Sequence, residues 1–119
     1  MDSSVLVVDD EENLLELLDW TLSKEGYQVK TTNNAYEALD LVDREDIGAA
    51  ILDINMYPVD GLSLLAEIKK RSPSTQVIMM TASPATATRN SCVKYGTMNY
   101  LTKPLDIPKL KNVLRGLAV

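Results

Sequence analysis

The sequence predicts a doubly wound α/β domain, in which one parallel sheet of five strands carries helices on both faces. Short apolar runs recur at residues 5–8, 49–52 and 77–80, and such runs are typical of strands buried on both faces of a parallel sheet. Segments with apolar residues at helical spacing alternate with these runs, which favours right-handed strand–helix–strand crossovers. Polar residues follow four of the expected strands directly. The expected strand order is 2-1-3-4-5, one of the two common doubly wound orders.

The first half of the chain contains two strands and two helices before the central strand. After the first run, residues 11–25 place leucines at helical spacing, and Gly26 ends this helix. Residues 27–32 are expected to form the second strand. Asn34 then caps a second helix, with Glu37 three residues later, and this helix extends to about residue 45.

The second half repeats the alternation three times. Gly48 opens the central strand, and a helix follows Asp60 and Gly61 and ends before Pro73. Strands are expected at residues 76–80 and 98–101. Between them, residues 84–95 should form a helix, although the threonines, asparagine and serine there are weak helix formers. Asp106 caps a last helix, whose first turn tolerates a proline.

Composition excludes several classes of protein. Twelve Lys and Arg against seventeen Asp and Glu give a net charge of −5, whereas direct nucleic-acid binding normally requires a basic patch. The chain has no His and one Cys, so neither a disulfide framework nor a cysteine–histidine zinc site is expected. It shows no secretory signal and no apolar run of about 20 residues that could cross a membrane. We therefore expect residues 1–119 to form one acidic, cytoplasmic domain.

The polar residues at the strand ends form the candidate site. Asp9 and Asp10 follow the first strand, Asp53 the third, Thr81 the fourth and Lys103 the fifth. Adjacent first and third strands would lie about 4.8 Å apart, so the three carboxylates would need a cation nearby. Mg²⁺ suits such an open cluster of oxygen ligands. With a lysine and a hydroxyl opposite, the site suits a phosphoryl group, and Asp53 is the candidate nucleophile.

The sequence also resembles the receiver domains of two-component response regulators over essentially its whole length. The matching motifs, in chain order, are Val8-Asp9-Asp10-Glu11, Leu52-Asp53-Ile54-Asn55-Met56 with Asp60-Gly61, Thr81-Ala82, and Gly96 through Tyr100-Leu101-Thr102-Lys103-Pro104. The resemblance implies a flavodoxin-like (βα)5 fold. It also implies a phosphorylation switch that takes its phosphoryl group from a sensor histidine kinase or a phosphotransfer protein.

The resemblance assigns a role to each site residue. Asp53 would be the phosphoacceptor. Asp10, Asp53 and the carbonyl of Asn55 would bind Mg²⁺ directly, and Asp9 would act through water. Lys103 would contact the phosphoryl oxygens and would be held by a cis peptide bond to Pro104.

The resemblance also implies how the signal leaves the site. Thr81 and Tyr100 would act as switch residues, and the surface formed by the helix at 84–95, the strand at 98–101 and the last helix would change. That surface could mediate a homodimer and contact with an effector. Whether the domain acts alone or with an effector domain is left open by the sequence.

The sequence departs from the family pattern at two places. Tyr57 stands where the family usually has proline, and Pro58 comes one residue later, so the loop after Asp53 is expected to follow a different path. Asn99 replaces an aspartate that many relatives carry. The charged pattern of the winged-helix subfamily is also missing from the last helix, so its characteristic dimer is not implied.

Two competing functions remain. A Mg²⁺-dependent phosphohydrolase with an aspartyl nucleophile would need an acid two residues after Asp53, where this chain has Asn55. A degenerate receiver that acts only as a scaffold would lack acidic, Lys or Thr positions, and none is missing. Structural roles also remain open for single residues: Asp9 or Asp10 as a helix cap, Tyr100 as a core aromatic, and Trp20 as a packing residue or a contact with the kinase.

Overall fold

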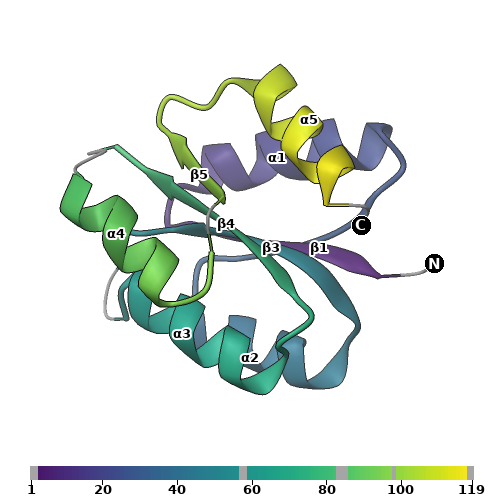
Figure 1. Cartoon of the computed structure of the whole chain (residues 1–119). Coiled ribbons are helices and arrows are strands. Elements are labelled where there is room, and N and C mark those ends of the chain that lie inside the picture. The colour runs from purple at the N-terminus through teal and green to yellow at the C-terminus, as the bar shows by residue number, and fades with distance from the viewer. Residues whose placement is uncertain (1–2, 57–58, 83–85, 98, 118–119) are drawn as a thin grey trace.

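The computed structural model describes residues 3–56, 59–82, 86–97 and 99–117 and has a five-stranded parallel sheet (Figure 1). The strands are β1 (Ser4–Val8), β2 (Gln28–Thr32), β3 (Ile47–Asp53), β4 (Gln76–Thr81) and β5 (Asn99–Thr102). They pair in the order β2-β1-β3-β4-β5, and every pair is parallel. The predicted fold class and strand order are confirmed.

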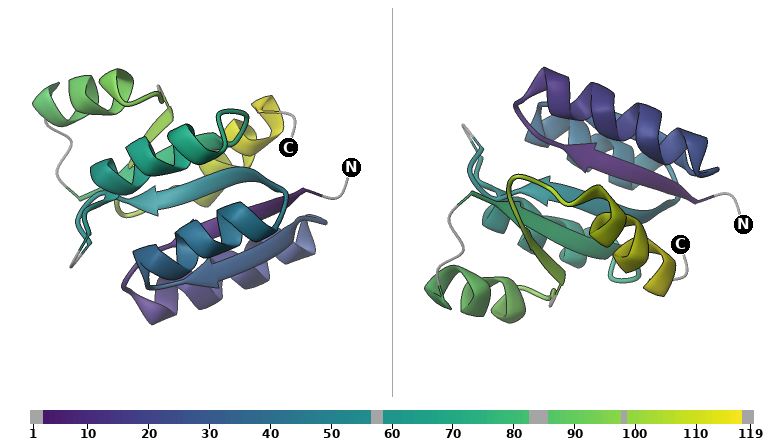
Figure 2. Two further views of the ribbon diagram at one scale, coloured as in Figure 1. Left: turned by 90° about the horizontal axis from the view of Figure 1, so that it is seen from below. Right: turned by 90° about the horizontal axis from the view of Figure 1, so that it is seen from above.

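The helices cover both faces of the sheet. They are α1 (Glu12–Lys24), α2 (Ala35–Arg44), α3 (Gly61–Arg71), α4 (Thr86–Lys94) and α5 (Ile107–Gly116). Helices α1 and α5 lie on one face, and α2, α3 and α4 lie on the other, as Figures 1 and 2 show together. Among the described helices, none combines the length and the apolar composition that crossing a membrane requires.

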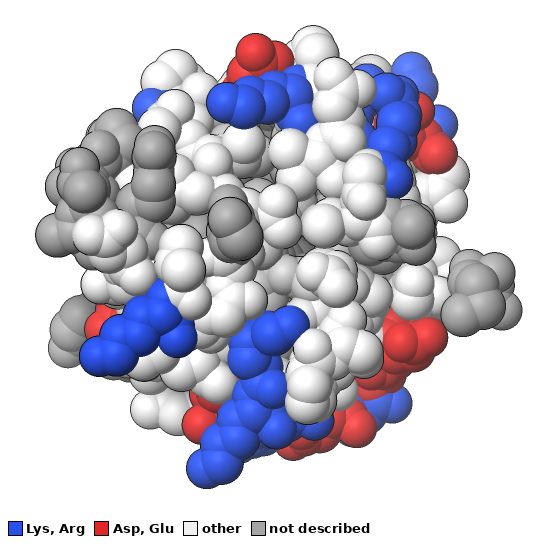
Figure 3. Space-filling model, viewed as in Figure 1, with Lys and Arg blue, Asp and Glu red and all other residues white. Residues whose placement is uncertain are grey.

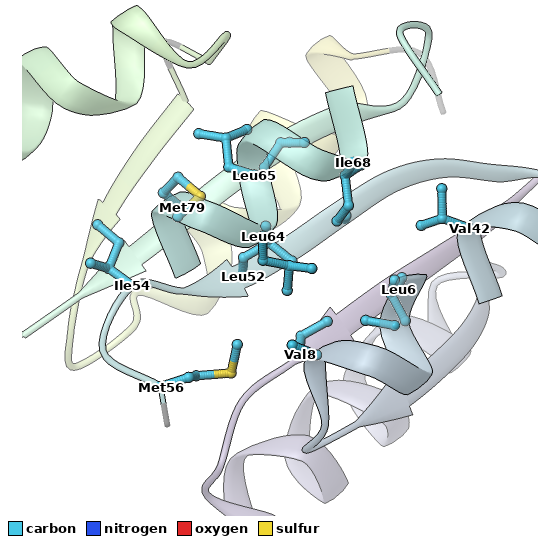
Figure 4. Close-up of a cluster of buried hydrophobic side chains, with 14 of the residues drawn as sticks. Leu6, Val8, Val42, Leu52, Ile54, Met56, Leu64, Leu65, Ile68 and Met79 are labelled. Carbon is cyan, nitrogen blue, oxygen red and sulfur yellow. The ribbon is translucent and has the colours of Figure 1, made fainter. Parts of the chain in front are cut away.

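The apolar core is divided by the sheet into two layers. Because side chains alternate along a strand, Val5 and Val7 of β1 pack toward α1 and α5, whereas Leu6 and Val8 pack toward α2 and α3. All four are fully buried. The layer between the sheet and helices α2 and α3, which also contains residues from the loop after β3, is shown in Figure 4. The central strands are therefore fixed from both sides.

Side-chain caps begin three of the helices, and Asn34 and Asp106 are the two caps that the sequence predicts. Asn34 Oδ1 accepts from Tyr36 N and Glu37 N, Asp60 Oδ1 from Ser63 N, and Asp106 Oδ1 from Lys109 N. Each cap pairs amide groups that the helix leaves without an internal acceptor.

The start of α1 is different. Its N-cap residue is Glu11, which makes no side-chain cap bond, and Asp9 Oδ1 instead accepts from Glu11 N at 2.9 Å. Asp9 therefore fixes the turn into α1 while its other oxygen faces the candidate site.

Several element boundaries differ by one residue from those predicted, and sheet pairing explains three of the differences. Strand β3 begins at Ile47 rather than Gly48, because Ile47 pairs with Ser4 across the sheet and is buried. Strand β4 extends to Thr81 and β5 to Thr102, since these two residues pair with each other. The predicted start of the fourth helix and Met98 lie outside the described residues.

Cys92 gives a test of the packing of α4. Its side chain is 1% exposed, and burial raises the pKa of its thiol. Since the thiolate is the reactive form, the native protein should react with a thiol reagent at least roughly tenfold more slowly than the urea-unfolded chain at about pH 8. A disulfide-exchange dye followed by absorbance measures both rates. Equal rates would show that α4 does not pack Cys92 against the core in solution.

Candidate functional site

The candidate site lies where four parallel strands end at one edge of the sheet. Because β1, β3, β4 and β5 are consecutive parallel strands of the sheet, the residues at their carboxyl ends meet at the same edge. The structure brings together Asp9 and Asp10 after β1, Asp53 at the end of β3, and Lys103 just after β5. Thr81 ends β4 at the same edge.

Three carboxylates form the acidic part of the site. One oxygen from each of Asp9, Asp10 and Asp53 lies within 4.8 Å of the others. Asp9 is fully buried, Asp53 is 4% exposed, and Asp10 is exposed to solvent. Oxygen ligands gathered at one side of an open edge suit a hard divalent cation that keeps some of its water, as Mg²⁺ does. The donor set therefore fits the predicted metal.

Lys103 is the cation that faces these carboxylates. Its Nζ lies 2.8 Å from Asp9 Oδ2, 3.3 Å from Asp53 Oδ2 and 3.7 Å from Glu11 Oε1. Burial by itself lowers the pKa of Lys103, but the hydrogen bond and charge of Asp9, together with those of Asp53, outweigh it and leave the pKa raised. The lysine therefore stays charged at neutral pH.

The ammonium does not neutralise the acidic cluster. Asp9, Asp10 and Asp53 together carry three negative charges when ionised, and Lys103 supplies one positive charge. Unbalanced negative charge at a largely buried edge is costly. The site is therefore suited to bind a further cation.

The backbone around Lys103 ties it to β4. Lys103 N donates to Thr81 O at 2.7 Å, and the peptide bond between Lys103 and Pro104 is cis. The hydrogen bond extends the β4–β5 pairing by one residue beyond the paired Thr81 and Thr102. It places the side chain of Lys103 over the ends of β1 and β3.

The carboxylate of Asp53 is oriented by its own loop. Its Oδ1 accepts from Asn55 N at 3.1 Å, and its Oδ2 faces Lys103. Ile54 N donates to Met80 O at 2.9 Å, which continues the β3–β4 pairing into the loop. The side chain of Asn55 is exposed. The expected effect of Tyr57 and Pro58 lies outside the described residues.

The two predicted switch residues lie at different depths. Thr81 is 1% exposed at the end of β4. Tyr100 is half-buried in β5 and packs against the core layer shared with α2 and α3. Thr81 thus lies on β4, the strand next to that of Asp53, and Tyr100 lies on β5, one strand further from Asp53.

A pocket beside the site is a feature that the sequence did not reveal. It has a volume of about 530 Å³, and Lys103 and Glu11 line it on the side of the carboxylates. Its other lining residues are all apolar: Leu14, Leu17, Ala82, Pro104, Leu105 and Ile107. Leu17 lies on α1 outside the stripe of buried residues and is 47% exposed. A leucine outside the buried face of its helix is the one sequence signal that could have indicated this pocket.

Comparison with known proteins agrees with this geometry. The family model of the response regulator receiver domain matches residues 5–115. The transcriptional regulatory protein GlrR of Escherichia coli K12 is 38% identical over 102 residues, which cover 86% of this chain and 23% of GlrR. A transcriptional regulatory protein ZraR from Klebsiella oxytoca is 38% identical over 92% of this chain and 25% of its own length. The chain thus spans about a quarter of the length of these curated relatives.

Solved structures of similar proteins have the same fold. A response regulator from Burkholderia pseudomallei, solved with a phosphorylated aspartic acid, a calcium ion and citrate, is 32% identical with a TM-score of 0.86, covering 92% of this chain and 64% of that one. The beryllofluoride-activated NtrC4 receiver domain, a dimer in solution, is 30% identical with a TM-score of 0.90, covering 96% and 94%. With the site and fold described above, the chain belongs to the response regulator receiver domain family, the phosphorylation-activated domain of two-component signalling.

Proposed function

We propose that Asp53 accepts a phosphoryl group from a phosphohistidine of a sensor histidine kinase or a phosphotransfer protein. The observation that carries this proposal is the position of Asp53, which is 4% exposed, pairs with Lys103 and lies within 4.8 Å of two further carboxylates. A neighbouring structure with a phosphorylated aspartic acid and a calcium ion supports the same chemistry here.

Different residues of the chain have separate roles in the proposed phosphoryl transfer. Asp10, Asp53 and the carbonyl of Asn55, with Asp9 through water, would hold Mg²⁺, which supplies charge that reduces the repulsion between Asp53 and the incoming phosphoryl group. An oxygen of Asp53 attacks phosphorus, the N–P bond of the donor breaks, and its electron pair stays on the imidazole nitrogen. Lys103 stabilises the negative charge on the phosphoryl oxygens. The product is an acyl phosphate on Asp53.

The proposed output surface consists of α4, β5 and α5. In our proposal Thr81 turns toward the phosphoryl group and Tyr100 moves inward, and the surface then engages an effector or a second copy of the chain. In Figure 3, which views these elements from the front, charged side chains lie above and below an uncharged band. The dimer of the activated NtrC4 receiver supports the homodimer.

We further propose that residues 1–119 act as one phosphoacceptor domain in the cytoplasm, where ATP-dependent kinases work. The domain catalyses only its own phosphorylation and dephosphorylation. At a net charge of −5, it is not expected to contact nucleic acid itself.

The competing phosphohydrolase requires a group that transfers a proton next to the nucleophile. Asn55 occupies the position of that group and cannot transfer a proton. Incubation with acetyl phosphate and Mg²⁺ separates the two functions: a receiver takes up one phosphoryl group per chain, measured by intact-protein mass spectrometry. Repeated turnover of small phosphate esters would contradict the proposal.

Mg²⁺ should stabilise the wild-type fold through the acidic cluster. At a concentration about 100 times its Kd, a ligand that binds only the folded state adds about 2.7 kcal/mol. Asp10→Asn should lose most of this stabilisation by Mg²⁺. In the absence of metal, the variant should be at least as stable as wild type, because it removes one of three neighbouring negative charges. Urea unfolding with and without Mg²⁺ measures both effects. Glu16→Gln, an exposed change on α1, should respond like wild type. An unchanged Mg²⁺ effect in Asp10→Asn would exclude Asp10 as a ligand.

The apolar pocket beside Lys103 is the place where we expect the donor protein to dock. Leu17→Ala should slow transfer from a histidine kinase roughly tenfold, the effect of losing about 1.4 kcal/mol at an interface. Transfer from acetyl phosphate should be unchanged, because this small donor does not need the pocket. Radiolabel transfer measures both rates. Val93→Ala, on α4 and 51% exposed, is the control, and equal slowing with both donors would place Leu17 in the chemistry instead.

A further inference from the structure

Gly61, the first residue of α3, lies directly against the backbone of the proposed phosphoacceptor. It is buried, and a Cβ at this position would overlap Asp53 O and would lie 2.8 Å from Asp53 C and 2.7 Å from Ile54 Cα. All three contacts are far shorter than the roughly 3.5 Å separation of non-bonded carbon atoms. Because the atoms belong to the backbone, no side-chain rotation can relieve the overlap.

Hydrogen bonds hold both backbone polar groups of Ile54, and these belong to the two successive peptide groups on either side of this residue. Gly61 N donates to Ile54 O at 2.9 Å, so the loop that leaves β3 returns to its own first residue. Ile54 N donates to Met80 O. Beneath the loop, the side chains of Ile54 and Met56 extend into the core layer (Figure 4) and are 7% and 9% exposed.

One further hydrogen bond connects this part of the loop to the reactive carboxylate of Asp53. Asn55 N donates to Asp53 Oδ1, so the orientation of the carboxylate depends on the peptide groups at Ile54 and Asn55. Helix formation alone does not explain a glycine here, since alanine is the better helix former and Asp60 already caps the helix. The glycine is required by the close approach of α3 to Asp53.

We propose that Gly61 is a positioning residue, which lets the first turn of α3 lie on the Asp53–Ile54 peptide and so fixes the Asp53 carboxylate relative to the other metal ligands. This inference rests on the proposed function, because it concerns the same site. It predicts that the contact determines metal affinity as well as stability.

Gly61→Ala tests the proposal directly. The Kd for Mg²⁺, measured by titration of backbone amide chemical shifts, should rise roughly 10- to 100-fold, the range for losing a group that orients metal ligands. Gly116→Ala is the matched control, because a Cβ there meets nothing within 4 Å. Ile68→Ala, at a fully buried position further along α3, should destabilise the fold while keeping the wild-type Kd. A wild-type Kd in folded Gly61→Ala would overturn the proposal.

A second pair of variants decides the matter if Gly61→Ala does not fold. Asp60→Ala removes the cap that holds the first turn of α3, whereas Asp60→Asn keeps a cap and removes the charge. Asp60→Ala should raise the Kd for Mg²⁺ severalfold over that of Asp60→Asn, and equal values would overturn the proposal. If the wild type binds Mg²⁺ but is not phosphorylated, that result would contradict the proposed function and leave the proposal about Gly61 standing.

Discussion

Asp53→Asn is expected to abolish the phosphorylation of this chain by acetyl phosphate. The substitution keeps the shape of the side chain, which is 4% exposed, but replaces the attacking carboxylate by a neutral amide. Removing a covalent nucleophile costs roughly 10³-fold or more in rate, so the labelling should fall below detection. Intact-protein mass spectrometry after incubation with acetyl phosphate and Mg²⁺ measures the result.

The matched control for this substitution is Asp46→Asn. Asp46 is exposed and lies just before β3, at the opposite end of the strand from Asp53. The control should label at the wild-type rate. Residual labelling of Asp53→Asn at a rate similar to that of wild type would show that another side chain accepts the phosphoryl group.

Lys103→Met is expected to destabilise the metal-free protein by about 3 kcal/mol. The side chain of Lys103 is 15% exposed, and its ammonium pairs with two carboxylates that are almost fully buried. Removing one partner of such a pair leaves uncompensated buried charge, which typically costs about 3–5 kcal/mol, and the open edge near Asp10 reduces this cost. Urea unfolding in a metal-free buffer measures the change.

The same variant separates stability from chemistry. Mg²⁺ should restore much of the lost stability, because it replaces the missing positive charge, whereas phosphorylation should stay slow for lack of the group that stabilises the phosphoryl oxygens. Lys109→Met, at an exposed position of α5, should behave like wild type. A Lys103→Met protein as stable as wild type without metal would show that the ion pairs contribute nothing.

The pH dependence follows from the raised pKa of Lys103. The folded state holds this proton more tightly than the unfolded chain does. The stabilisation is therefore complete below the unfolded pKa of about 10.4 and is lost as pH rises through the higher folded value. The stability difference between wild type and Lys103→Met should accordingly be constant near neutral pH and decrease only in strong alkali.

Much of the fold could be predicted from local signals. The buried runs at β1, β3 and β4 have no polar interruption, and the capping residues Asn34 and Asp60 precede their helices directly. Parallel connections then bring the strand ends to one edge, so the proximity of Asp9, Asp53 and Lys103 followed from order alone. The site could be located because Asp53 and Thr81 end their strands and Asp9, Asp10 and Lys103 closely follow theirs.

The contacts that the sequence did not predict depend on distances between segments. No local pattern shows that Lys103 lies closer to Asp9 than to Asp53, or that Glu11 also reaches it. The requirement for Gly61 arises from the return of α3 onto the Asp53 peptide, which only the packed structure reveals. The start of β3 at Ile47 likewise depends on pairing with β1.

The most direct test of the central claim is to locate the phosphoryl group on the chain. After incubation with acetyl phosphate and Mg²⁺, borohydride reduces an acyl phosphate to an alcohol, and peptide mass spectrometry identifies the altered residue. We predict that the reduced side chain is that of Asp53 and that Asp9 and Asp10 are unchanged. Reduction at Asp9 or Asp10, or a phosphoryl group on a hydroxyl side chain, would contradict the assignment of Asp53 as the phosphoacceptor.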